Sequence, residues 1–153
     1  MYKKILSIAS VLIFAILCGC ASVPMDSLDQ DAQRKKFDEP SDGKASIYIF
    51  RDSNFGGALK KLVKIDGYAV GNTAPKTYFY VEVSSGSHTV STESEFGENS
   101  VTVDTIKGQS YFVRQYMKPG LIVGGSGLKI VDSLTGQKGV QSCQLALSYF
   151  DPS

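Results

Sequence analysis

Apolar and polar residues alternate with a period of two through most of the chain after Ala45. Between residues 77 and 83, for example, Phe79, Val81 and Val83 alternate with tyrosine and glutamate, which is typical of a β-strand. Turn signals such as Asp66-Gly67 separate the segments of this kind. The pattern predicts about eight short strands, at residues 45–51, 59–65, 68–70, 77–83, 88–93, 100–106, 111–117 and 128–131.

Short strands at nearly even spacing indicate an all-β fold, and we expect a mainly antiparallel β-sandwich. The end of the chain is ambiguous, because its apolar residues fit both helical and strand spacing. We favour a short C-terminal helix over residues 137–149, which places Cys143 on a buried face. Gly136 and Gly139 weaken this helix, because glycine is a poor helix former.

Residues 21–43 are polar and irregular, and we expect them to form a tether. As a random coil this segment would span about 25 Å. Its middle predicts one short helix, because Asp26 and Ser27 are good N-caps and the basic residues 34–36 suit a helix C-terminus.

The N-terminus has the pattern of a signal peptide. Lys3 and Lys4 precede an uncharged run at residues 5–17, and small residues follow. A helix of that run would be about 20 Å long, whereas the hydrocarbon core of a bilayer is about 30 Å thick. A cleaved leader is therefore favoured over a retained signal anchor or a buried helix.

The segment Leu17-Cys18-Gly19-Cys20 resembles the lipobox of bacterial lipoproteins. This resemblance implies cleavage between Gly19 and Cys20 and a lipid on the Cys20 sulfur. Ala21 follows, where aspartate would favour retention in the inner membrane, so the resemblance implies the outer membrane, facing the periplasm. The chain is thus expected to divide into a signal peptide (1–19), a lipidated tether (20–43) and a β-sandwich domain (44–153).

Residues 64–90 resemble the PEGA-type surface repeat, in which a strand ends in Asp-Gly and a later strand follows Gly-x-His. The wider span of residues 45–143 is similar to an uncharacterised domain family of proteobacterial lipoproteins. Both resemblances imply a small antiparallel β-sandwich, and neither defines a catalytic residue.

Composition narrows the possible functions. The chain has 16 basic and 15 acidic residues, which argues against a nucleic-acid-binding protein. One histidine and three cysteines leave little material for a metal site, so we expect neither metal nor cofactor. After processing, Cys143 is the one cysteine without a lipid, and we expect it to be a small buried residue rather than a reactive thiol.

The candidates for catalysis are few. His88 follows a serine-rich turn, but a hydrogen bond within that turn explains it better than a catalytic base does. Glu93, Glu95 and Glu98 cluster in one loop, where we expect solvated acids rather than a catalytic or calcium-binding pair. An enzyme is therefore not the preferred interpretation.

Two features are candidates for contact with a partner. Tyr78 and Tyr80 alternate with Phe79, so an inward Phe79 would turn both tyrosines outward, where such residues suit sugar stacking or protein contact. Tyr116 is a further candidate for the same face. The competing interpretation is that these tyrosines stabilise cross-strand pairs on a sheet face. Ile122 lies in a glycine-rich segment with apolar neighbours, which is either a strand crossing between sheets or a loop that docks onto a partner or a bilayer.

These features favour a non-catalytic binding or scaffolding module of the bacterial envelope, attached to the membrane through Cys20. Protein–protein contact is the preferred mode of action. Binding of a glycan or of peptidoglycan is the alternative.

Overall fold

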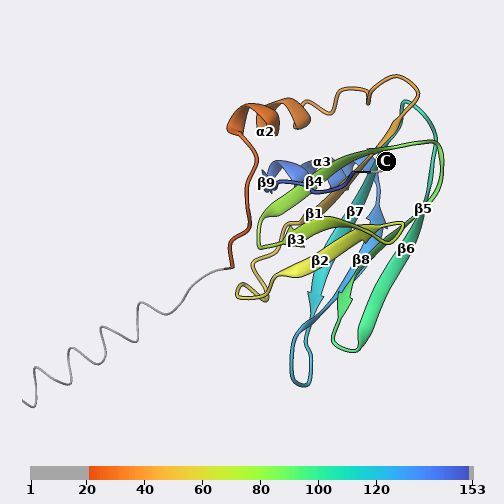
Figure 1. Ribbon diagram of the computed structural model, residues 1–153. Helices are drawn as coiled ribbons and strands as arrows, with labels where there is room; N and C mark the ends of the chain where they lie inside the picture. The colour runs from red at the N-terminus through yellow and green to blue at the C-terminus, as the bar shows by residue number, and fades with distance from the viewer. Residues whose placement is uncertain (1–20, 152–153) are drawn as a thin grey trace, which may run out of the picture.

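The computed structural model describes residues 21–151, so the leader, the cleavage position at Gly19 and the lipidation position at Cys20 lie outside the described residues. Nine strands form two sheets that pack face to face (Figure 1). The five-stranded sheet has the order β8-β7-β1-β4-β9 and the four-stranded sheet has the order β3-β2-β5-β6. The strands are β1 (Ala45–Arg51), β2 (Lys61–Ile65), β3 (Tyr68–Thr73), β4 (Thr77–Val83), β5 (Gly86–Ser94), β6 (Gly97–Thr105), β7 (Ser110–Lys118), β8 (Gly125–Val131) and β9 (Gln144–Leu145).

This architecture confirms the mainly antiparallel β-sandwich. The pairs β1–β7 and β4–β9 are parallel, and the remaining strand pairs are antiparallel. All eight predicted strands are present, and β1 and β4 have the predicted bounds. The ninth strand, β9, is the one that the alternating pattern did not separate from a helix.

Strand β1 is buried along its whole length, so the five-stranded sheet has a core on each face. One core lies between the two sheets, and its buried members are aliphatic apart from Phe79. The other lies on the outer face of the five-stranded sheet and is largely aromatic. Its buried members are Tyr48, Phe50, Tyr78, Phe112, Val140, Cys143 and Leu145.

The second core corrects the expectation that Tyr78 and Tyr80 face outward. Tyr78 is fully buried and Tyr80 is half-buried, because helix α2 (Leu28–Arg34) lies over them. The Tyr78 hydroxyl donates a hydrogen bond to the Asp31 carbonyl, and the Arg34 guanidinium carbon lies 4.0 Å from the centre of the Tyr80 ring. The alternation in β4 therefore separates two buried faces, not a buried face from an exposed one.

The polar segment 21–43 contains the helix that we predicted but is not a random coil. The Ser27 hydroxyl accepts a hydrogen bond from the Gln30 amide and caps α2. Before the helix, the Asp26 amide donates to the Leu145 carbonyl, and the Leu147 amide donates to the carbonyl of residue 24. These backbone bonds hold the segment against the domain.

The C-terminal helix lies earlier than we expected. Helix α3 spans Ser133–Gln141, not residues 137–149, because the Asp132 carboxylate accepts the Thr135 amide and starts the helix there. After the helix ends, β9 pairs with β4, so the strand-like spacing at residue 145 was the correct signal. Cys143 is buried as expected, but it lies beyond the helix.

Two glycines explain how α3 covers the aromatic core. A Cβ at Gly136 would lie 2.1 Å from Cγ of Phe112, and a Cβ at Gly139 would lie 2.1 Å from Cε2 of Phe50. Such distances are far below van der Waals contact, so the helix backbone rests directly on the two rings. The glycines that weaken the helix in isolation are what allow it to dock.

We therefore predict that Gly139→Ala destabilises the fold by about 2 kcal/mol, because the added methyl group overpacks the contact with Phe50. Alanine at an ordinary helical position would instead stabilise by about 1 kcal/mol relative to glycine. Urea unfolding followed by circular dichroism measures the difference. The matched control is Lys138→Ala on the exposed side of α3, which should leave the free energy of unfolding nearly unchanged.

Candidate functional site

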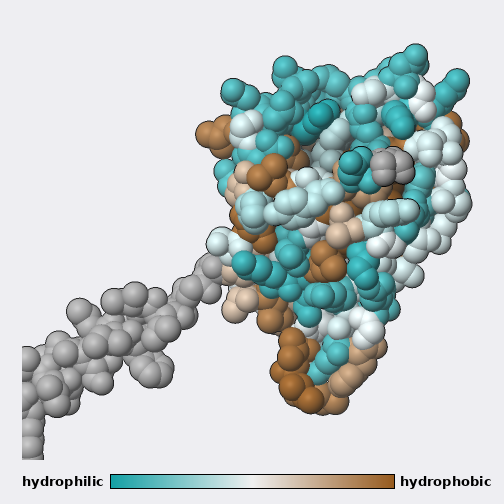
Figure 2. Space-filling model, viewed as in Figure 1, coloured by the Kyte–Doolittle hydropathy of each residue, from teal (hydrophilic) through white to brown (hydrophobic). Residues whose placement is uncertain are grey.

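An exposed apolar loop between β7 and β8 is the clearest candidate for a contact site. Its three apolar residues, Leu121, Ile122 and Val123, are called the apolar tip below. Leu121 is 92% exposed and Ile122 is 84% exposed. Figure 2 shows this loop as a hydrophobic projection from the lower end of the molecule. The structure therefore favours the docking-loop interpretation of this segment over a strand that crosses between the sheets.

A single carboxylate organises the loop. Glu95, in the turn between β5 and β6, accepts hydrogen bonds from the amides of Ile122 (2.6 Å), Leu121 (3.0 Å) and Val123 (3.2 Å). These amides, that of Ile122 most strongly, hold the pKa of Glu95 below its ordinary value. Glu95 therefore stays ionised and fixes the backbone from which the apolar side chains project.

Glu93 and Glu98 lie opposite each other on β5 and β6, and Glu95 lies in the turn between these strands, but the three glutamates bind different partners. Glu93 accepts the Leu62 amide and Glu98 pairs with the Lys64 ammonium, while Glu95 binds the loop. Each glutamate has a separate structural partner, so the expectation of merely solvated acids is wrong for Glu95. Sequence reasoning missed its role, because residues 95 and 122 are brought together only by two neighbouring hairpins.

The loop between β1 and β2 supports the base of the apolar loop. Leu59 contacts Gly124, and Gly56 lies against the Met117 side chain. The Ala21 amide donates a 2.9 Å hydrogen bond to the Gly57 carbonyl. The start of the described chain is therefore attached to the same loop that supports the apolar tip.

A buried arginine holds that supporting loop. Arg51 is fully buried, and its guanidinium donates to the carbonyls of Phe55, Gly56 and Leu59 at 2.7–3.1 Å. Burial lowers the pKa of Arg51, and no carboxylate of the described residues forms an ion pair with it. Three carbonyl dipoles instead compensate the charge, because a buried cation is costly unless polar groups surround it.

A buried polar network also lies in the interior at this end of the sandwich. Thr73 donates to the Gln115 side chain (2.5 Å), which donates to Thr92 (2.7 Å), and the Thr92 hydroxyl contacts that of Ser126 at 2.9 Å. The network joins β3, β5, β7 and β8. Because each member has a partner, it fixes the relative position of the two sheets. The sequence signal for this network is Gln115, a polar residue at a position of β7 where the alternation predicts a buried apolar residue.

His88 forms the turn-side hydrogen bonds that we expected. Nδ1 lies 2.6 Å from Oδ2 of Asp66, and Nε2 lies 2.9 Å from the Ser84 carbonyl oxygen. Burial lowers the pKa of His88, but the hydrogen bonds to Asp66 and Ser84 outweigh burial and raise it overall. Both ring nitrogens face acceptors, so the geometry favours the protonated ring over a free catalytic base.

We predict that Asp66→Asn lowers the pKa of His88. Asn keeps the left-handed turn at residue 66 (φ 52°) and its Oδ1 still accepts the Thr89 amide, while the charge is lost. His88 is the sole histidine, so its proton resonances in an NMR titration report the pKa directly.

The same pair makes stability depend on pH. Because the folded pKa of His88 lies above its ordinary value of 6.5, the stabilisation is full below pH 6.5 and is lost as the pH rises through the folded pKa. This loss should be smaller in Asp66→Asn. An unchanged pKa in the variant would contradict the assignment.

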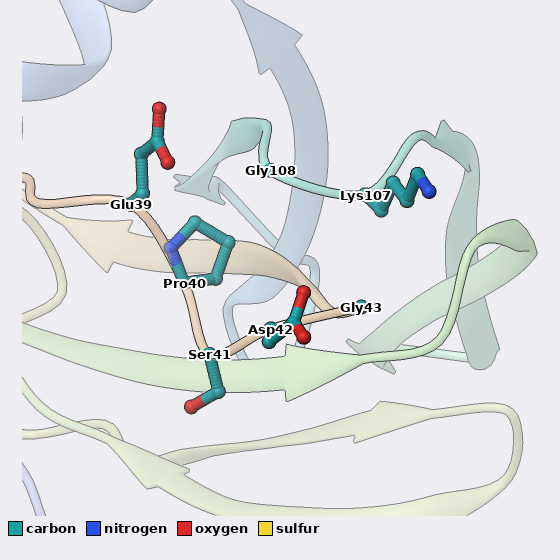
Figure 3. A pocket seen from close by; sticks show the side chains of 7 residues that line it. All are labelled: Glu39, Pro40, Ser41, Asp42, Gly43, Lys107 and Gly108. Atoms are coloured by element: carbon teal, nitrogen blue, oxygen red, sulfur yellow. The ribbon is translucent and has the colours of Figure 1, made fainter.

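Two surface hollows have a different character from the apolar loop. A polar hollow of about 260 Å³ is lined by Glu39, Pro40, Ser41, Asp42, Gly43, Lys107 and Gly108 (Figure 3). Since β1 and β7 run parallel, this hollow lies where both strands begin and the apolar tip lies where both end. A second hollow of about 200 Å³ lies beside His88 and Phe150.

The remaining candidates are structural. The Tyr80 hydroxyl donates to Glu82 and its ring lies under Arg34, while Tyr116 is partly exposed with the Lys118 ammonium 5.6 Å from its ring centre. Burial raises the pKa of the Cys143 thiol to about 11, which agrees with an inert buried residue. Within residues 21–151, no cluster of three or more acidic, histidine or cysteine side chains is placed to hold a metal ion. No helix in this described range is long and apolar enough to cross a membrane.

Comparisons with known proteins identify relatives without a stated activity. Residues 41–127 match a protein family described as "Protein of unknown function (DUF2846)". An uncharacterised protein from Haemophilus influenzae is 38% identical over 148 residues, which cover 96% of this chain and 88% of the relative. No solved structure matches the chain.

Proposed function

The chain belongs to the DUF2846 family of proteins of unknown function, and we propose that it is a lipid-anchored, non-catalytic binding or scaffolding module of the bacterial envelope. The lipobox-like segment ending in Cys20 supports the anchor. By the rules of that motif, the lipoprotein resides in the outer membrane and faces the periplasm.

The packing of residues 21–26 onto the domain is the observation that carries this proposal. Ala21 is bonded to Gly57, and the Asp26 amide is bonded to the Leu145 carbonyl. A lipid on Cys20 would therefore hold the folded body directly at the bilayer surface, without a flexible spacer. A module held in this way acts on partners that lie close to the membrane.

Contact with another envelope protein is the preferred mode of action. The polar hollow where β1 and β7 begin is the exposed feature that we assign to this contact, and the apolar tip at Ile122 is a separate exposed surface at the opposite end. Tyr78 no longer contributes, because it is buried, and Tyr80 is covered by Arg34.

Binding of a glycan or of peptidoglycan stays the alternative. In the sequence this alternative was suggested by a row of outward-facing tyrosines, but Tyr78 is buried and Tyr80 is covered by Arg34 in the structure. Its remaining support is the polar hollow, where Ser41, Asp42 and Lys107 offer hydrogen-bonding groups of the kind that bind sugar hydroxyls. The resemblance of residues 64–90 to the PEGA-type surface repeat fits either mode.

The anchor is tested by comparing Cys20→Ala with Cys18→Ala in cells fed a radiolabelled fatty acid. We expect Cys20→Ala to lose the label and to keep its leader, because the thioether forms on sulfur alone. Cys18→Ala is the matched control, since it changes a neighbouring thiol within the removed leader, and it should be labelled and processed normally. An unlabelled parent protein would contradict the proposal.

Binding is tested by photo-crosslinking in the same cells, with a photoreactive residue at Ile106. This side chain is 64% exposed and lies next to Lys107 of the polar hollow. We expect a discrete protein adduct there, and none from the same residue at buried position 145. An adduct that carries cell-wall sugar instead would favour the glycan alternative.

A further inference from the structure

The apolar tip has a shape that suits a fluid surface. Leu121 and Ile122 are almost fully exposed at the end of a projecting loop, and residues 119–125 carry no charge. A protein partner would need a pocket complementary to this projection, whereas a bilayer deforms around it. Exposed apolar side chains at a loop tip gain from transfer out of water into the acyl boundary.

The backbone of the tip is already prepared for such a transfer. An unpaired amide is costly in hydrocarbon, so a loop that enters a bilayer must satisfy its own N–H groups. Glu95 accepts all three amides of the apolar tip. The carboxylate belongs to the turn between β5 and β6 and not to the apolar tip itself, so it would stay nearer the lipid headgroups if the side chains of the tip entered a bilayer.

The start of the described chain lies on the same side of the molecule. Ala21 is bonded to Gly57, and the loop that contains Gly57 supports the base of the apolar loop through Leu59 and Gly124. Figure 1 shows the loop between β7 and β8 at the lower end of the domain, and the start of the described chain beside the loop between β1 and β2 at its lower left. A lipid on the residue before Ala21 would therefore bring this side to the bilayer.

We propose that Leu121, Ile122 and Val123 insert into the lipid bilayer as a second attachment point beside the lipid on Cys20. The inference rests on the proposed lipid anchor and assigns the apolar tip to lipid instead of protein. Two attachment points fix the orientation of the domain, whereas one acyl-bearing residue leaves it free to rotate. The polar hollow at the beginning of β1 and β7 then faces away from the membrane.

The test uses the full chain, produced in bacteria, purified in detergent and reconstituted into vesicles of phosphatidylethanolamine and phosphatidylglycerol. An environment-sensitive fluorophore is attached to Ile122→Cys. Ile106→Cys is the matched control, because it replaces another exposed isoleucine at the opposite end of the domain. Labelling of the unsubstituted protein should be absent, since a lipidated Cys20 has no free thiol and Cys143 is buried.

We expect the probe at residue 122 to shift to shorter wavelength and to be quenched by doxyl-labelled lipids, with no change at residue 106. Adding Glu95→Ala to the Ile122→Cys protein should weaken the quenching, because three amides of the tip lose their acceptor. Glu98→Gln, on the same hairpin but bonded to Lys64, should leave it unchanged.

Three outcomes would overturn the inference. A vesicle-bound protein whose probe at residue 122 stays in water, like that at residue 106, refutes insertion but leaves the lipid anchor intact. A blue shift at residue 122 without quenching by doxyl lipids indicates contact with another protein chain. A chain that labels at Cys20 and does not associate with vesicles refutes the anchor and, with it, the insertion.

Discussion

The burial of β1 on both faces is the constraint on which the rest of the structure depends. A sheet whose central strand is apolar on each side needs a cover for each side, and the second sheet provides only one of them. The other cover comes from segments outside the sandwich, helix α3 and the residues around α2. The polar N-terminal segment packs on the domain because part of it covers Tyr48, Tyr78 and Tyr80 on the outer face of the five-stranded sheet.

This requirement also fixes where the described chain begins on the domain. The same segment that covers the tyrosines begins at Ala21, where it is bonded to the loop held by Arg51. Arg51 is the last residue of β1. The residue that ends the central strand therefore also holds the loop to which the start of the described chain is bonded. A lipid placed on the preceding cysteine would act on the rigid body of the domain and not on a flexible arm.

The sequence contained most of the fold, because alternation and turn residues are local signals. The strands at 45–51 and 77–83 and the cap at Ser27 follow from them directly. What covers each face of a strand is not a local property. Tyr78 alternates with Phe79 in the same way whether the face that carries Tyr78 is exposed to water or covered by a helix. The candidate site was predicted in part, since the apolar run at Ile122 is visible in the sequence. Its organiser, Glu95, depends on a contact between two hairpins that no spacing encodes.

The parallel pairing of β1 with β7 gives the molecule two functionally different ends. Both strands begin beside a polar hollow and end beside loops that carry the apolar tip and the start of the described chain. If β1 and β7 were antiparallel, the start of one strand would lie beside the end of the other. The polar hollow and the apolar tip would then not be separated at opposite ends of the domain. If the proposed anchor and insertion hold, the groups directed to the membrane share one end, and the opposite end is the part of the domain left to contact a partner. The proposed scaffold would use this separation of an attached end from an exposed end, and the parallel pairing of β1 with β7 supplies it.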